Sequence, residues 1–180
     1  MLFRSRGRMT PLAPQRFGYQ FTGDEETHSE YEKFRERMGY EIPSGAMALV
    51  FKAALKLANA ALDKRQLAAT DRPRQARETT NPRHIPAKDK REVAERDEGR
   101  CTFVSESGKR CGSRCEPQFH HDDEFARGGP SVAKNLRLLC RAHNQHEAER
   151  SFGHELVERK KQEARERSAA RKRRMAPARE

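Results

Sequence analysis

The sequence predicts an α+β protein built around one small ββα unit, with a helical segment before this unit and a basic helix or tail after it. Three observations lead to this fold class. Two short alternating segments, which end at His121 and at Cys140, are separated by a loop that contains Gly-Gly-Pro at 128–130. A helical pattern follows the second segment. Cysteine and histidine residues lie in paired spacing around the same segments, as in small domains that a metal ion stabilises.

The composition limits the core and indicates the partner. Only 34% of the 180 residues are hydrophobic, 36% are charged and Trp is absent, so the packed part must be local. The formal net charge is +11, which favours a polyanion as partner, and we expect nucleic-acid binding that depends strongly on salt. The simpler alternative is that the excess of Arg only makes the surface soluble.

The chain carries no pattern typical of a membrane or secreted protein. No apolar run approaches the ~18 residues that span a bilayer, and the first residues are too short and too broken for a secretory signal. We therefore expect a cytoplasmic protein without a membrane partner. In a reducing compartment, four cysteines are more readily metal ligands or free thiols than disulfides.

Changes in composition divide the chain into five segments. The first mixes Arg, Pro and Gly without periodicity, and the third has three prolines and almost no large apolar side chains. In the fourth, residues 87–96 predict a short charged helix. We predict a disordered arm at 1–21, a helical hairpin segment at 22–63, a linker at 64–86, the ββα domain at 87–153 and a basic helical tail at 154–180.

Two helices are predicted in the helical hairpin segment. Thr22 can act as the N-cap of the first helix and Gly39 ends it. Ser44 offers the N-cap of the second, whose apolar residues recur at helical spacing. The apolar face of residues 44–63 is interpreted either as a surface for DNA or for a homodimer, or as the core of the helical hairpin.

Four side chains have the spacing of a zinc site. Cys101 and Cys111 lie on either side of a Gly-containing turn, and Cys140 and His143 are separated by two residues at the start of a predicted helix. Such a site would stabilise a domain that is too small to fold on its own. Cys115 is an alternative ligand through the Cys111-x-x-x-Cys115 step, but it would leave the first hairpin strand unattached, so we favour Cys101.

A pair of histidines ends the first alternating segment. Because adjacent strand residues point to opposite faces, His120 and His121 cannot normally bind one ion together. One can bind a metal while the other, held neutral, accepts a proton from water. Asn135 closes the following loop, and Asn144 comes directly after His143. Taken alone, a His pair is more often ordinary polar surface.

The combined pattern resembles the HNH endonuclease motif, and roughly residues 84–153 resemble its zinc-stabilised bacterial branch. The resemblance is carried by the order His-His, Asn135 fourteen positions after His121, and LLCRAHN, within GRCTFVSESGKRCG…FHHDDEFARGGPSVAKNLRLLCRAHNQHEAE. It implies a ββα-metal fold and hydrolysis of DNA phosphodiester bonds. Many members have Cys-x-x-Cys-His where this chain has Cys140-Arg-Ala-His-Asn144, so the chain resembles an HNN variant.

The resemblance implies a role for each matching residue. His120 and Asn144 would bind the catalytic ion, His121 would be the general base, and Asn135 would hold the loop and orient the base. Oxygen donors with only one imidazole favour Mg²⁺ or Mn²⁺ as the catalytic ion. His143 aligns with a ligand of the structural Zn²⁺, not with the third catalytic residue.

The chain departs from this family directly after the histidine pair. The family commonly has an apolar residue and a proline there, whereas this chain has the acidic run 122–124. These acids could add affinity for a metal ion or repel DNA phosphate. The alternative function is a zinc-stabilised DNA-binding module with impaired catalysis.

The end of the chain has helix-forming residues but few apolar ones. Between 159 and 174, nine basic residues stand against two acidic ones, which leaves seven positive charges. We interpret this tail as a sequence-independent DNA contact, with a merely solvated helix as the alternative.

Overall fold

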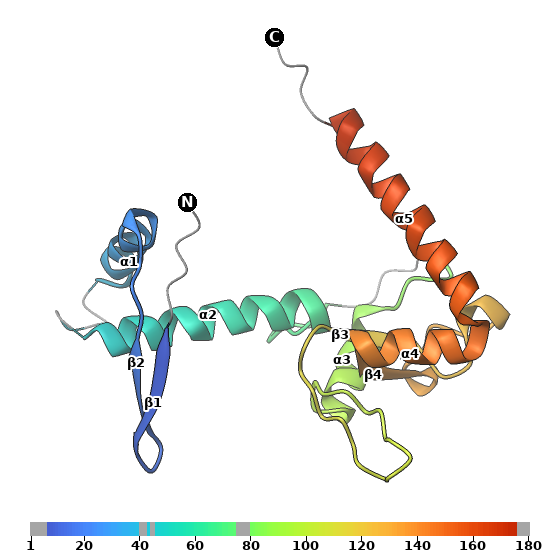
Figure 1. Ribbon diagram of the computed structural model, residues 1–180, viewed down its shortest axis with the longest axis horizontal. Coiled ribbons are helices and arrows are strands. Elements are labelled where there is room, and N and C mark those ends of the chain that lie inside the picture. Colours follow the sequence, from blue (N-terminus) through green and yellow to red (C-terminus); the bar gives the residue numbers. More distant parts are fainter. Residues whose placement is uncertain (1–6, 40–42, 44–45, 75–79, 176–180) are drawn as a thin grey trace. The chain divides into compact units, whose positions relative to one another are not determined.

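The computed structural model describes residues 7–39, 43, 46–74 and 80–175, as an α+β chain that divides into two compact units (Figure 1). Unit 1 covers residues 1–61 and unit 2 residues 62–180. The elements of the described residues are β1 (Arg8–Ala13), β2 (Arg16–Gln20), α1 (Glu25–Met38), α2 (Met47–Leu67), α3 (Ala87–Arg96), β3 (Pro117–His121), β4 (Leu136–Cys140), α4 (Arg141–Phe152) and α5 (His154–Met175). None of their helices is long and apolar enough to cross a membrane.

Unit 1 begins with a β-hairpin where the sequence predicted a disordered arm, and for residues 7–21 that prediction was wrong. Strands β1 and β2 pair in antiparallel register, with Met9 opposite Tyr19, and Gln15 adopts a positive φ of 61° in the turn. The missed signal is the alternation of Phe17, Tyr19 and Phe21 with small or polar residues, which is typical of a strand. Residues 1–6 lie outside the described residues.

The helices of unit 1 differ from the prediction mainly at their starts. Asp24, not Thr22, is the N-cap of α1, because its side chain accepts a hydrogen bond from the Thr27 N–H at 2.9 Å. Gly39 ends the helix, as predicted, with a φ of 53°. The predicted N-cap Ser44 lies outside the described residues, and α2 begins at Met47.

The apolar face of α2 is only partly covered. The ring of Phe51 lies 5.5 Å from the ring of Tyr19 and 6.1 Å from that of Phe21, so the β-hairpin packs on this helix. These aromatic residues line a groove of about 620 Å³ with Met47 and Leu55. Val50 is the only buried residue among those described in unit 1, so most of this apolar surface stays exposed.

Unit 2 has its core between α3 and the β3–β4 hairpin. Val93 of α3 packs against Leu136 and Leu138 of β4, and all three are fully buried. Asp97 ends α3 and is buried. Its carboxylate accepts a hydrogen bond from the Leu138 N–H at 2.7 Å. Helix α3 has the predicted bounds. This hydrogen bond fixes α3 against the strand that leads into α4.

The predicted linker at 64–86 contains the end of a helix and residues that pack against the core of unit 2. Helix α2 continues through its first residues to Leu67, and both Leu67 and Ile85 pack against the core of unit 2. Two apolar side chains separated by prolines and charges give no periodic pattern, so the sequence did not reveal their contacts. Residues 75–79 lie outside the described residues.

Candidate functional site

Four side chains of unit 2 form a cluster that can hold a metal ion. The cluster consists of Cys101, Cys111, Cys140 and His143, whose ligand atoms all lie within 4.8 Å of one another. His143 Nδ1 is 3.4 Å from Cys101 Sγ and 3.3 Å from Cys140 Sγ. Tetrahedral zinc, with Zn–S near 2.3 Å and Zn–N near 2.0–2.1 Å, would separate such atoms by about 3.5 Å. The cluster is therefore compatible with structural zinc.

Backbone pairing brings the two halves of this cluster together. The N–H of Cys101 donates to Ser113 O and that of Cys111 to Phe103 O, which closes a small hairpin. Cys140 ends β4 at the N-cap position of α4, and His143 follows one turn later. The Phe103 ring stacks on the His143 imidazole with centroids 3.9 Å apart, and this contact fixes the ring.

Charge and burial differ among the cysteines. Burial raises the pKa of the Cys101 thiol above its ordinary value. Burial also acts to raise the pKa of Cys140, but hydrogen bonds from the His143 backbone and from neighbouring thiols outweigh it and lower the pKa. The lowered pKa favours the thiolate of Cys140, which is the form that binds a cation. Cys115 is exposed and outside the cluster, which favours Cys101 as predicted.

A second centre lies where β3 faces α4. His120 Nδ1 is 2.9 Å from Asn144 Oδ1, so the ring donates its N–H to the amide oxygen. Asn144 Nδ2 in turn donates to Gln118 Oε1 at 2.6 Å. Gln118 lies two residues before His120 and therefore on the same face of β3. This pair of hydrogen bonds sets the direction of the Asn144 amide.

His121 faces a different set of neighbours. Ser131 Oγ donates its only hydrogen to Pro82 O at 3.1 Å, so it accepts from His121 Nε2–H, also at 3.1 Å. The neutral imidazole is thereby left with its lone pair on Nδ1, which has no partner among the described residues. Burial, and then the charges of His120 and Arg83, lower the pKa of His121. The lowered pKa favours the neutral imidazole, whose Nδ1 can accept a proton.

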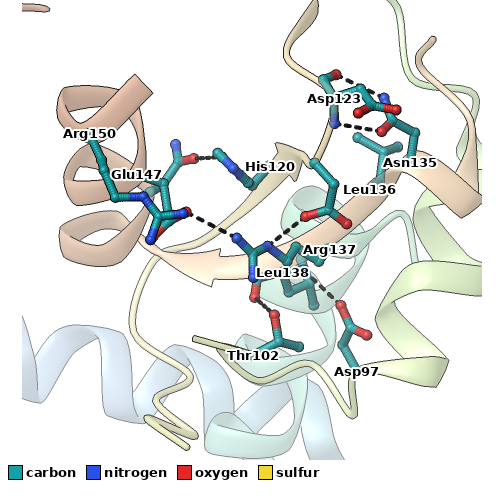
Figure 2. A network of polar contacts seen from close by, with 12 residues as sticks. Asp97, Thr102, His120, Asp123, Asn135, Leu136, Arg137, Leu138, Glu147 and Arg150 are labelled. Atoms are coloured by element: carbon teal, nitrogen blue, oxygen red, sulfur yellow. Dashed lines mark hydrogen bonds and ion pairs between the residues drawn. The ribbon is translucent and has the colours of Figure 1, made fainter. Parts of the chain in front are cut away.

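Asn135 holds the loop between the strands, as the resemblance implied (Figure 2). Its side chain accepts the Asp123 N–H at 2.8 Å and donates to the carbonyls of Asp123 and Pro130, both at 3.0 Å. The loop passes so close that a Cβ on Gly129 would lie 1.8 Å from Asp123 O. Any larger residue at 129 would force the loop away from Asn135.

Arg137 lies at the centre of a chain of charges beside His120, its partner across the strands (Figure 2). Its guanidinium is 2.8 Å from the Asp122 carboxylate and 3.2 Å from the carboxylate of Glu147. Glu147 is buried and also pairs with Arg150 at 3.0 Å. Asp122, from the acidic run, is therefore balanced by an arginine and is not a free charge in the site.

Glu124 is the other acid of this run with partners. It forms an ion pair with Arg127 at 3.4 Å. A hydrogen bond with Ser151, followed by the backbone of Glu124 itself, lowers its pKa. Two of the three acids of this run, Asp122 and Glu124, are thus engaged within the protein.

The structure places all four residues predicted for the catalytic centre within the β3–β4–α4 unit. His120 contacts Asn144, and Asn135 is hydrogen-bonded to the loop that follows His121. Sequence reasoning missed Gln118, Ser131 and Arg137. The alternation of β3 could have revealed Gln118 as a neighbour of His120. Ser131 and Arg137 carried no signal, because their partners are set by strand register and by a distant segment.

Comparison of the chain with protein-family models, with curated proteins and with solved structures found no match. The functional argument therefore rests on the geometry of these two centres.

Proposed function

We propose that the chain is a metal-dependent endonuclease of the HNH type, which hydrolyses phosphodiester bonds in DNA. The observation that carries the proposal is the 2.9 Å contact between His120 Nδ1 and Asn144 Oδ1, with His121 on the opposite face of the same strand. Neighbouring ligands of an octahedral Mg²⁺ at 2.0–2.1 Å are about 3 Å apart. With the ring proton of His120 moved to Nε2, the two atoms have the spacing of ligands that share a Mg²⁺ or Mn²⁺ ion.

His120 and Asn144 would hold this ion, and Gln118 would keep the Asn144 oxygen directed toward it. The bound ion would supply Lewis-acid activation of the scissile phosphate and of the leaving 3′ oxygen. His121 Nδ1 takes a proton from the attacking water as its oxygen bonds to phosphorus. The bond from phosphorus to the 3′ oxygen breaks in line, and that oxygen takes a proton from solvent, leaving 5′-phosphate and 3′-hydroxyl ends.

The proposed roles of zinc and of the charged surface are supporting ones. Zn²⁺ in the Cys101, Cys111, Cys140 and His143 cluster would fix α4, and with it Asn144, against β3. DNA is the proposed substrate because of the net charge of +11 and the basic helix α5. The ion pair of Asp122 with Arg137 speaks against the alternative of an impaired module, because it removes one of the charges that would repel phosphate.

The proposal is tested with purified protein and supercoiled plasmid in Mg²⁺, in Mn²⁺ and in EDTA. We expect cleavage in both metal ions and none in EDTA, with ends that a DNA ligase can rejoin because they carry 5′-phosphate and 3′-hydroxyl groups. DNA binding without cleavage in every metal ion would favour the impaired module instead.

The lowered pKa of His121 predicts the pH range of activity. A histidine base works when it is neutral, and burial holds the pKa of His121 below its ordinary 6.5. The plasmid cleavage rate in saturating Mg²⁺ should therefore lose half its value at a pH below 6.5. The same shift makes the fold less stable as pH falls through this range, because the unfolded chain takes the proton more readily. Circular dichroism at each pH separates the two effects, and a midpoint above 6.5 would contradict His121 as the base.

A further inference from the structure

Residues 80–86, which precede α3, are linked to the side chain of His121 through the hydroxyl of Ser131. The carbonyl of Pro82 accepts the Ser131 hydroxyl at 3.1 Å, and the same hydroxyl oxygen accepts from His121 Nε2 at 3.1 Å. Residues 80–86, which the sequence predicted to be part of a linker, therefore form a wall beside His121.

Arg83 is the one cation that this wall presents beside His121. Its guanidinium carbon lies 5.4 Å from the ring centroid of Phe125, and the Phe125 and His121 rings are 5.8 Å apart. Stacking on an aromatic ring holds a guanidinium in place while its N–H groups stay open to a ligand. Within the described residues, the Arg83 side chain has no carboxylate partner and is exposed.

Other arginines of unit 2 show what is unusual here. Arg137 and Arg96 are bound to carboxylates, and Arg127, which also lies over a ring, is paired with Glu124. Arg83 combines the aromatic contact with an unpaired charge. A planar fork of N–H donors without a carboxylate matches the geometry of a phosphate.

We propose that Arg83 binds a backbone phosphate of the nucleic acid at the His121 side of the centre, and that the Ser131–Pro82 hydrogen bond holds its segment there. The inference rests on the proposed function, since the phosphate belongs to the chain that would be cleaved. Arg83 is thus assigned to substrate binding, and Ser131 to positioning both Arg83 and the His121 ring.

DNA affinity without metal ion tests this assignment apart from catalysis. A fluorescein-labelled DNA duplex of mixed sequence is titrated without added Mg²⁺ or Mn²⁺, and without chelator, at several salt concentrations with wild type, Arg83→Ala, Arg83→Lys and Lys109→Ala. Lys109 is an exposed lysine in the turn of the zinc-site hairpin, and its loss removes the same charge. Arg83→Ala should weaken binding about tenfold and reduce the salt slope by about one.

The two other variants complete the expected pattern. Arg83→Lys should keep the wild-type salt slope, because the charge remains, with affinity between the wild type and Arg83→Ala. Lys109→Ala should leave both quantities close to wild type. Equal losses in Arg83→Ala and Lys109→Ala, or none in either, would overturn the inference.

The outcomes separate this inference from the proposed function. A wild-type protein that cleaves plasmid, together with an Arg83→Ala variant that binds DNA normally, would refute the role of Arg83 and leave the nuclease standing. A wild-type protein that neither binds nor cleaves DNA would refute the proposed function, and the role of Arg83 with it.

Discussion

Replacing His121 by alanine is expected to lower the rate of plasmid cleavage in Mg²⁺ by roughly 10²–10⁴-fold, which is the usual contribution of a positioned general base. Among the described residues, only His121 combines a free Nδ1 lone pair, a fixed tautomer and a lowered pKa. Initial rates of supercoiled plasmid loss measure the effect. His154→Ala is the matched control, because this imidazole is 71% exposed and lies on α5.

The variant should lose cleavage activity but keep its fold and its affinity for DNA. His121→Ala should bind the labelled duplex without added Mg²⁺ or Mn²⁺ as the wild type does, with an unchanged circular dichroism spectrum. Cleavage at the wild-type rate by His121→Ala would show that another group takes the proton. A loss in His154→Ala of similar size would place the active centre elsewhere.

Much of the candidate site could be predicted because its reactive and metal-binding residue types lie close together in the sequence. The two-residue period of a strand separates His120 from His121, and the structure gives the two rings different partners. The step from Cys140 to His143 at a helix start predicted two members of the cluster that can hold a metal ion. Asn135 was expected to hold the loop, and it bonds both to Asp123 and to Pro130.

The rest depended on contacts between distant residues, which periodicity does not encode. Pro82 and Ser131 are 49 positions apart, and nothing in either residue type predicts that they meet. The charge of Asp122 could not be judged without Arg137, whose position depends on the register of β3 and β4. The hairpin of residues 8–20 was hidden by its Arg, Pro and Gly content, which is typical of an arm.

The largest effect on stability is expected from Cys140→Ser. Unit 2 packs only a small apolar core, around Val93, Leu136 and Leu138, beside the metal-binding cluster. Structural zinc contributes an apparent ~10–16 kcal/mol in small zinc domains at neutral pH, which is comparable to the ~5–15 kcal/mol total stability of a typical domain. Loss of one thiolate from the four ligands should therefore unfold unit 2, lower its zinc content and abolish cleavage.

Cys115→Ser distinguishes this loss of a ligand from the mere loss of a thiol. Cys115 is exposed and outside the cluster, so its replacement should leave the metal content and the thermal unfolding midpoint near wild type. Metal analysis after dialysis and thermal unfolding followed by circular dichroism measure both variants. EDTA strong enough to remove zinc should reproduce the Cys140→Ser result, whereas dialysis against weak chelator should stop only cleavage. Equal stability of the two variants would mean that the cluster does not stabilise the fold. Loss of a proposed ligand, Cys140, would then have the same effect as loss of Cys115, which lies outside the cluster.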